Sequence, residues 1–116
     1  MPSEGLANRR WLSDIQYHAK LAQHFVDGID CETFRDDLMR FHAVTRCLEI
    51  ISEASRRLPD EIRARHPSIS WKEMAAAGNI YRHDYEDVAA SYVWVTVRDH
   101  LPPLLIVIDQ ELGSPQ

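Results

Sequence analysis

The stretch AGNIYRHDYE, from Ala77 to Glu86, places an amide, two phenols, a guanidinium, an imidazole and two carboxylates within ten positions. The imidazole of His83, with an ordinary pKa of ~6.5, can take up and release a proton at neutral pH. The neighbouring guanidinium of Arg82 could stabilise charge that develops on a phosphate, and the amide of Asn79 could orient either group. Histidine with arginine is enough for metal-free RNA cleavage, in which a base removes the 2′-hydroxyl proton and the oxygen attacks the adjacent phosphodiester.

The same stretch also has a purely structural interpretation. Gly78 would break the helix, Asn79 would cap the next turn, and Arg82 and His83 would favour a helix C-terminus electrostatically. On an α-helix, Asn79 and His83 would share a face. Because perturbed chemistry cannot be read from residue spacing, the sequence leaves both interpretations open.

Other chemistries find less support. None of the six histidines forms an HxxxH or HExxH pair, and neither cysteine lies near another ligand at metal spacing, so we expect no metal site and no cofactor. The four glycines form no GxGxxG or P-loop pattern. Cys31 and Cys47 form no CxxC pair and are interpreted as reduced, partly buried thiols.

The length of 116 residues predicts one domain over residues 1–116, with an ordered core from about residue 8 to 112. The formal net charge of −5 excludes a basic surface overall, so RNA binding requires a local basic patch. Candidates for that patch are Arg46, Arg56 and Arg57 together with Arg82. The N-terminus has no apolar signal region and no apolar run approaches membrane-spanning length, so we expect a cytoplasmic protein without membrane contact.

Helical periodicity covers almost the whole chain. A first helix is expected from about Asn8 to Ile29, where apolar residues recur at spacings of three, four and seven. Asp30 could cap the next segment, whose apolar stripe runs from Phe34 to Leu58 without Gly or Pro and predicts the longest helix. Pro59 ends this second helix, because proline cannot continue its hydrogen bonding.

The second half predicts shorter helices. Asp60 could cap a short helix over EIRARH, and Ser70 with Glu73 forms a capping-box pattern that opens a helix to about His83. A last helix begins at Asp87, and the pair Pro102-Pro103 must kink or divide it. No strand-turn-strand pattern occurs, so the sequence predicts an all-α, up-and-down bundle of four or five helices.

Three stretches carry a resemblance to a known family. They are RCLEIISEA from Arg46 to Ala54, the tryptophan-led helix that ends in HDY, and DHLPPL from Asp99 to Leu104. With the layout from about residue 12 to 112, they resemble the HepT-like group of the HEPN superfamily. The resemblance implies an all-helical homodimer that acts as a ribonuclease toxin, in a type II or AMPylation-regulated toxin–antitoxin system, with a minimal nucleotidyltransferase as its antitoxin.

The family's site is an Arg-x4–6-His motif near the dimer interface, so that two copies face one another across a cleft. By this resemblance His83 is the motif histidine, and Asn79 matches the polar residue that commonly follows the motif arginine. Tyr85 matches the tyrosine that the antitoxin modifies with AMP in many members. An adenylyl group at Tyr85 would place a bulky, negatively charged phosphate in the RNA cleft and block it.

The chain departs from this motif at the arginine. Counting back from His83, the places for arginine are occupied by Gly78, Ala77 and Ala76, none of which can stabilise an anion. Arg82 is the nearest substitute, although neighbours on a helix point about 100° apart. Arg82 would reach the cleft only from a frayed helix end or across the dimer axis.

The resulting prediction is a metal-independent endoribonuclease that cleaves RNA at a dimer-interface cleft, with His83, Arg82 and Asn79 as its catalytic candidates. One alternative is a HEPN-fold protein that binds RNA or a nucleotidyltransferase partner without cleaving, which the missing arginine favours. Another is a purely structural helical bundle.

Overall fold

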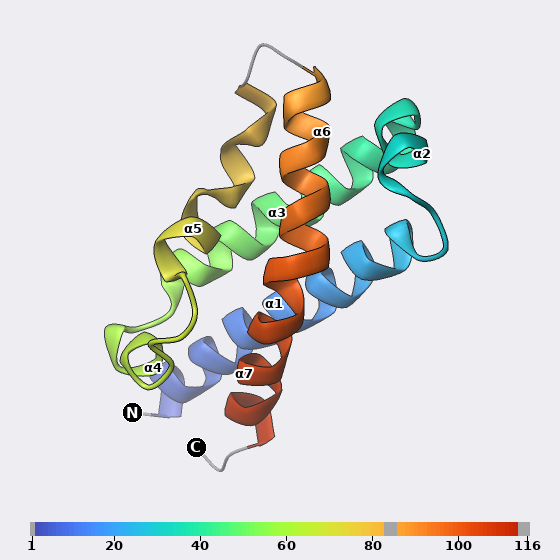
Figure 1. Ribbon diagram of the computed structural model, residues 1–116. Coiled ribbons are helices and arrows are strands. Elements are labelled where there is room, and N and C mark those ends of the chain that lie inside the picture. Colours follow the sequence, from blue (N-terminus) through green and yellow to red (C-terminus); the bar gives the residue numbers. More distant parts are fainter. Residues whose placement is uncertain (1, 83–85, 114–116) are drawn as a thin grey trace.

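The computed structural model describes residues 2–82 and 86–113, and within them no strand occurs. The all-α class predicted from the sequence is confirmed. The elements are α1 (Pro2–Val26), α2 (Cys31–Asp36), α3 (Leu38–Arg57), α4 (Asp60–Ala64), α5 (Trp71–Ala76), the 3-10 helix η1 (Ala77–Arg82), α6 (Glu86–Val95), the π-helical turn η2 (Thr96–His100) and α7 (Leu101–Gly113) (Figure 1).

The first helix is longer than the sequence predicts. It begins at Pro2 rather than near Asn8, because proline is well suited to the first helical position, where no N–H is needed. It ends at Val26, and Gly28 follows with a φ of +78°, a conformation that glycine adopts without steric cost. At 25 residues, α1 exceeds the 20 residues of α3, so the prediction that the second helix is the longest was wrong.

Two aspartates divide the predicted second helix. Asp30 caps α2 by accepting a 2.8 Å hydrogen bond from the Thr33 N–H, as predicted. Asp37 then caps α3 in the same way, accepting from the Arg40 N–H at 3.1 Å. An aspartate carboxylate competes with the helix for backbone donors, which explains why α2 and α3 are separate elements. The sequence did not predict this break.

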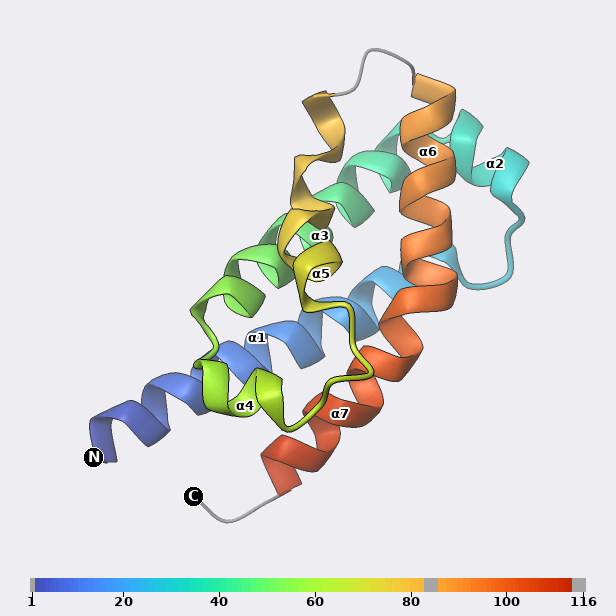
Figure 2. The same cartoon turned by 60° about the vertical axis from the view of Figure 1, so that its left-hand side comes forward.

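The core lies where α1, α3 and the rod formed by α6, η2 and α7 meet. Helices α1 and α3 run side by side, and the rod crosses them (Figures 1 and 2). Their shared interior holds fully buried side chains that include Leu12, Ile15, Phe34, Val44, Leu48, Ile51, Val93, Leu101, Leu104 and Ile108. Leu38, placed on the apolar stripe by its spacing, is instead 59% exposed at the beginning of α3.

The predicted caps of α4 and α5 do not form. Pro59 occupies the N-cap position of α4, and Asp60 lies in the first turn, where its carboxylate pairs with Arg63. Ser70 is at the N-cap of α5 but makes no side-chain capping bond, so the capping box with Glu73 is absent there. Both helices are short: α5 packs against α3, and Arg65 and His66, which follow α4, bond Glu111 on α7.

The rod is divided at the predicted point. Pro102 and Pro103 lie in the first turn of α7, where a missing N–H costs little. Immediately before them, η2 widens the helix so that the Leu101 N–H reaches back to the Thr96 carbonyl. The Thr96 hydroxyl donates to the Tyr92 carbonyl at 2.9 Å and ties the turn to α6.

Candidate active site

The segment that approaches the motif histidine changes its helical form. α5 passes directly into η1, so the predicted α-helix from Trp71 to His83 is wrong from Ala77 onward. His83 and Tyr85 lie outside the described residues, as does the side chain of Arg82. The structure therefore describes the segment that precedes His83, α5 and η1, and the contacts that hold this segment.

A hydroxyl group from α3 accounts for this change. In a regular α-helix the Gly78 N–H would donate to the Met74 carbonyl. Here the Gly78 N–H donates to Ser52 Oγ at 2.7 Å, and Ser52 Oγ donates to the Met74 carbonyl at 2.8 Å. The Ala77 N–H bonds to the same carbonyl across three residues instead of four. Because the Ser52 hydroxyl is inserted into the hydrogen-bond ladder, α5 opens and continues as η1.

Position 78 has no room for a side chain. Gly78 is buried, and a Cβ atom there would lie 2.9 Å from Glu49 Cα and 3.1 Å from Ser52 Oγ. The first of these atoms belongs to the backbone, so no rotamer change can relieve the clash. An arginine at position 78 would clash with the backbone of α3, which excludes this place of the family motif, while the other two places hold the buried Ala77 and the exposed Ala76.

Arg56 secures the adjacent carbonyl of the same turn. Its guanidinium donates to the Ala75 carbonyl at 2.6 Å and to the Glu53 carboxylate at 2.8 Å. Arg57 donates to the other oxygen of Glu53 at 2.9 Å and lies over the Trp11 ring. The hydrogen bonds from Arg56 and then Arg57 hold the pKa of Glu53 below its usual range. These two arginines, predicted to bind RNA, make these contacts within the protein while their side chains remain 47% and 60% exposed.

Arg46, the third predicted RNA-binding residue, is arranged differently. It lies two helical turns before Glu53 on α3, its side chain is 70% exposed, and it pairs with Glu49 at 3.6 Å. Glu49 is the residue whose Cα abuts Gly78. Arg46 therefore places an exposed guanidinium one turn away from the contact between α3 and η1.

The other end of α5 is fixed by its tryptophan. The Trp71 indole Nε1–H is shared between the carbonyl oxygen of Arg63 in α4, at 3.1 Å, and that of His66 in the α4–α5 connection, at 3.0 Å. The ring packs against the core while this bond holds the α4–α5 connection.

Glu111 ties this connection to α7. Its carboxylate is buried and accepts bonds from Arg65 Nε at 3.0 Å, Arg65 Nη2 at 2.6 Å and His66 Nε2 at 2.7 Å. Because an ionised carboxylate can only accept, His66 Nε2 must carry the hydrogen. The bonds from Arg65, with a smaller contribution from His66, lower the pKa of Glu111. The segment from α5 to η1 is thus anchored at both ends.

Asn79 is the catalytic candidate whose side chain the structure describes, and it is exposed on η1. Residues three apart share a face of a 3-10 helix, so position 79 is aligned with position 82. The pairing of Asn79 with His83 that an α-helix would give involves a residue outside the described ranges. The geometry brings the positions of two of the three predicted catalytic residues to one face.

Other candidate chemistries find no support in the fold. Among the described residues, no three histidine, cysteine, aspartate or glutamate side chains gather as metal ligands. Cys31 is partly buried and Cys47 buried, both as free thiols, and burial raises the pKa of Cys47 to about 11. A thiol with so high a pKa is a poor nucleophile at neutral pH. No helix in the described part of the chain is long and apolar enough to span a bilayer.

Ser52 is a residue of this site that its sequence pattern did not reveal. It lies within RCLEIISEA, on the buried face of α3 next to Ile51. A small polar residue among buried apolar ones is a usable signal, because a buried hydroxyl normally requires a partner. The partner itself could not be predicted, since it is the backbone of another helix.

Comparison with known proteins identifies the family. The model of the family described as "Ribonuclease HepT-like" matches residues 15–111, a range that includes the Ser52–Gly78 contact and the stretch around His83. The chain belongs to the HepT-like ribonuclease family. It is 36% identical over 98 residues to "Probable ribonuclease HepT" of Thermococcus cleftensis, covering 84% of this chain and 89% of the relative.

Two further relatives have the same extent. "Putative RNase MJ1380" of Methanocaldococcus jannaschii is 34% identical over 96 residues, covering 83% of this chain and 88% of that protein. "Putative RNase TTE0752" of Caldanaerobacter subterraneus is also 34% identical over 96 residues, covering 83% of this chain and 86% of that protein. No solved structure shows significant similarity to the chain. The HepT-like resemblance seen in the sequence is confirmed at the level of the family.

Proposed function

We propose that this HepT-like protein is a metal-independent endoribonuclease that works as a homodimer. The observation that carries the proposal is the family match across residues 15–111, because it includes the predicted site. His83 acts as general base and acid on the 2′-hydroxyl and the leaving oxygen. Arg82 stabilises the charge on the phosphate, and Asn79, exposed on the same face of η1, orients the reacting groups.

An exposed apolar surface supports the homodimer. It consists of Val88, Tyr92 and Val95 on α6, together with Leu38 and Met39 at the start of α3, all between 42% and 85% exposed. The three α6 residues are spaced four and three apart and so share one face.

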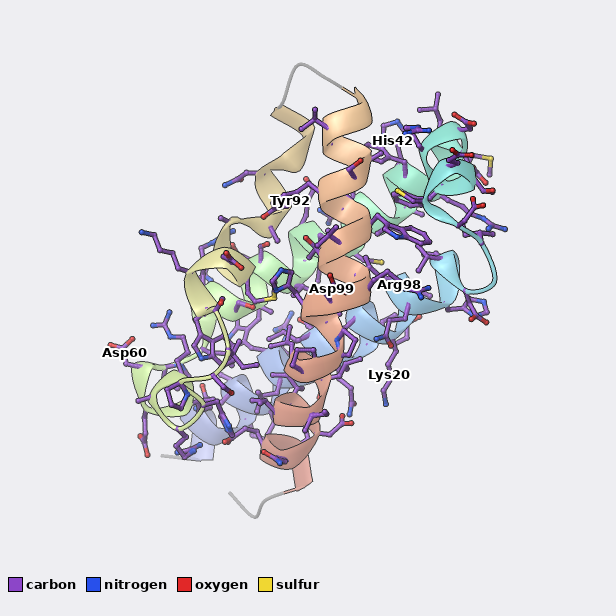
Figure 3. All side chains as sticks on the ribbon, viewed as in Figure 1. Lys20, His42, Asp60, Tyr92, Arg98 and Asp99 are labelled. Atoms are coloured by element: carbon purple, nitrogen blue, oxygen red, sulfur yellow. The ribbon has the colours of Figure 1, made fainter. Side chains whose placement is uncertain are left out.

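A shallow pocket lies beside Leu38, between the α2–α3 region and α6. It is lined by Arg35, Leu38, Phe41 and His42 from the α2–α3 region and by Ala90 from α6. Figure 3 shows His42 at this end of the molecule, beside α2. Exposed apolar groups around such a pocket are typical of an interface that a second copy covers.

RNA binding by an acidic protein needs a local cationic site. Arg46 is the strongest of the three predicted RNA-binding residues, because Arg56 and Arg57 already bond Glu53 and, for Arg56, the Ala75 carbonyl. In the dimer, Arg46 and Arg82 of both copies would supply positive potential to one cleft.

Regulation by AMP transfer is part of the proposal. A minimal nucleotidyltransferase antitoxin would transfer AMP from ATP to the Tyr85 hydroxyl, releasing pyrophosphate, and the added phosphate would block the RNA cleft. Incubation with such an enzyme and ATP should add one AMP to the wild type and to Tyr81→Phe, but none to Tyr85→Phe, as measured by intact mass. AMP addition to Tyr85→Phe would contradict this assignment.

The test of the cleavage proposal is RNA hydrolysis in EDTA by purified protein. We expect the wild type and the control variant His24→Ala, which changes an exposed histidine on α1, to cleave alike. His83→Ala and Arg82→Ala should each lose at least about a hundredfold in rate. Full activity of His83→Ala would refute the assignment of the general base.

One observation favours a second function. The three places for the arginine of the family motif hold Gly78, Ala77 and Ala76, and position 78 has no room for a side chain, which is what a member that binds RNA or its nucleotidyltransferase without cleaving would show. Absence of cleavage by the intact wild-type dimer, together with retained RNA binding, would establish this second function.

A further inference from the structure

The contact between Ser52 and Gly78 contains specific hydrogen bonds in addition to helix packing. One hydroxyl serves as acceptor for the Gly78 N–H and as donor to the Met74 carbonyl, at 2.7 and 2.8 Å. Ser52 is 1% exposed, and its partners are both backbone groups of the segment that leads to His83. An unbroken α-helix would have bonded these same two groups to one another.

We propose that Ser52 is a positioning residue for the ribonuclease site, which it sets by fixing the helical phase of η1. This inference rests on the proposed function. An α-helix turns by about 100° and rises by about 1.5 Å per residue, whereas a 3-10 helix turns by about 120° and rises by about 2.0 Å. Over the four steps from residue 78 to 82, the two forms therefore differ by about 80° and about 2 Å.

Displacement on this scale is decisive for catalysis. A misplacement of about 1 Å can cost about a hundredfold in rate, even when it originates far from the chemistry. Without the Ser52 hydroxyl, the Gly78 N–H and the Met74 carbonyl can bond directly, and η1 relaxes toward an α-helix. In η1, positions 79 and 82 are aligned because they lie one 3-10 turn apart. In an α-helix this alignment is lost, so the position of Arg82 moves relative to Asn79.

Gly78 is needed for the same contact, because it allows η1 to approach α3 closely. Because its Cβ would lie 2.9 Å from Glu49 Cα, only glycine lets η1 approach α3 closely enough for the Ser52 bonds. Adding a methyl group at 78 separates the two elements and lengthens both bonds while leaving the hydroxyl present. The two residues thus act through one contact from opposite sides.

The chain offers a matched control for Ser52. Ser55 lies one turn later on α3 and is also 1% exposed, but its hydroxyl finds no hydrogen-bond partner among the described residues. Ser55→Ala removes the same atom from the same helix without touching the ladder of α5. Any effect that Ser52→Ala shows and Ser55→Ala lacks is specific to the inserted hydroxyl.

The experiment compares wild type, Ser52→Ala, Ser55→Ala and Gly78→Ala as full-length chains. Two readouts are measured: the kcat and KM of RNA cleavage in EDTA, and the imidazole NMR resonances of the histidines. In Ser52→Ala and Gly78→Ala we expect kcat to fall by at least about tenfold, KM to change less than about twofold and the His83 resonances to shift. Ser55→Ala should match the wild type in both readouts, and the double variant should lose little more than either single one.

The inference is overturned if Ser52→Ala and Ser55→Ala give the same kcat, or if the His83 resonances of Ser52→Ala do not move. A purely structural role would lower thermal stability without the selective loss of kcat, and this result also overturns it. If the wild type cleaves no RNA, the proposed function fails. The NMR comparison then decides by itself whether Ser52 positions the segment that leads to His83.

Discussion

Replacing Glu111 by glutamine should destabilise the fold by removing the clamp between α7 and the α4–α5 connection. The buried carboxylate accepts two bonds from Arg65 and one from His66, and an amide can accept at only one of its two ends. The amide NH2 group would face N–H donors, so at least one bond is replaced by an unfavourable contact.

The size of the effect depends on the exposure of the partners. A hydrogen bond to a charged group contributes about 1.5–3 kcal/mol, but Arg65 is 46% exposed and water can replace part of its interaction. We therefore expect the free energy of unfolding to fall by about 2 kcal/mol, below the roughly 3–5 kcal/mol typical of a fully buried broken pair. For a domain of this length the midpoint of thermal unfolding should drop by roughly 8 °C.

The assay is urea denaturation followed by tryptophan fluorescence, at one fixed protein concentration because the stability of the proposed homodimer would depend on it. Glu61→Gln is the matched control, since Glu61 pairs with the same guanidinium at 3.6 Å but is 84% exposed. Its loss should remain within about 0.5 kcal/mol. Equal losses for the two variants would refute the reasoning.

The difference between Glu111→Gln and the wild type should also depend on pH. The pKa of Glu111 is lowered in the folded protein from its ordinary value of 4.5, so the charged form is favoured by folding. The contribution of the Glu111 carboxylate to the free energy of unfolding is complete above pH 4.5 and is lost as the pH falls through the lower pKa of the folded state. The two unfolding curves should therefore converge in acid, and a difference that grows there would contradict the assignment.

Three further outcomes can be measured on the same protein. Thr45→Val should raise the free energy of unfolding by about 1 kcal/mol, because the buried Thr45 hydroxyl has no partner among the described residues; a loss of stability would contradict this. Asp37→Ala should cost about 1 kcal/mol by removing the cap of α3, whereas Asp36→Ala, at the exposed end of α2, should be nearly neutral. With a thiol reagent at mildly alkaline pH, partly buried Cys31 should react first and Cys47, with its pKa of about 11, only on unfolding; equal rates would refute the burial argument.

Periodicity in the sequence was sufficient for the class of fold and for most of the core. Ile15, Ala22 and Val26 are buried as their spacing predicts, because a helix can hide only one stripe of side chains. The cap at Asp30 was predictable for the same local reason: its carboxylate bonds a backbone N–H three residues away.

The missed break between α2 and α3 is a local capping effect of Asp37, whereas the errors at the candidate site arose where distant residues decide. The change from α5 to η1 depends on Ser52, which is 26 positions before Gly78 in the chain. Local signals around Gly78 indicated a break but not its form, and no capping pattern at Ser70 could outweigh the anchoring of Trp71 by the Arg63 and His66 carbonyls. The candidate site is therefore predictable in its residue types, while its geometry depends on tertiary contacts.

The π-helical turn between α6 and α7 determines how the chain tolerates changes in length. A π turn holds one residue more than an α turn, so deleting one residue within Thr96–His100 would restore an unbroken α-helix. Because the π turn takes up this one extra residue, α7 would keep nearly the same rotation relative to α6, and Leu104 and Ile108 would stay in the core. In families of related chains, loss of one residue within Thr96–His100 should therefore be tolerated, whereas a deletion within α6 or α7 would rotate the residues that follow by about 100° and move them off the core.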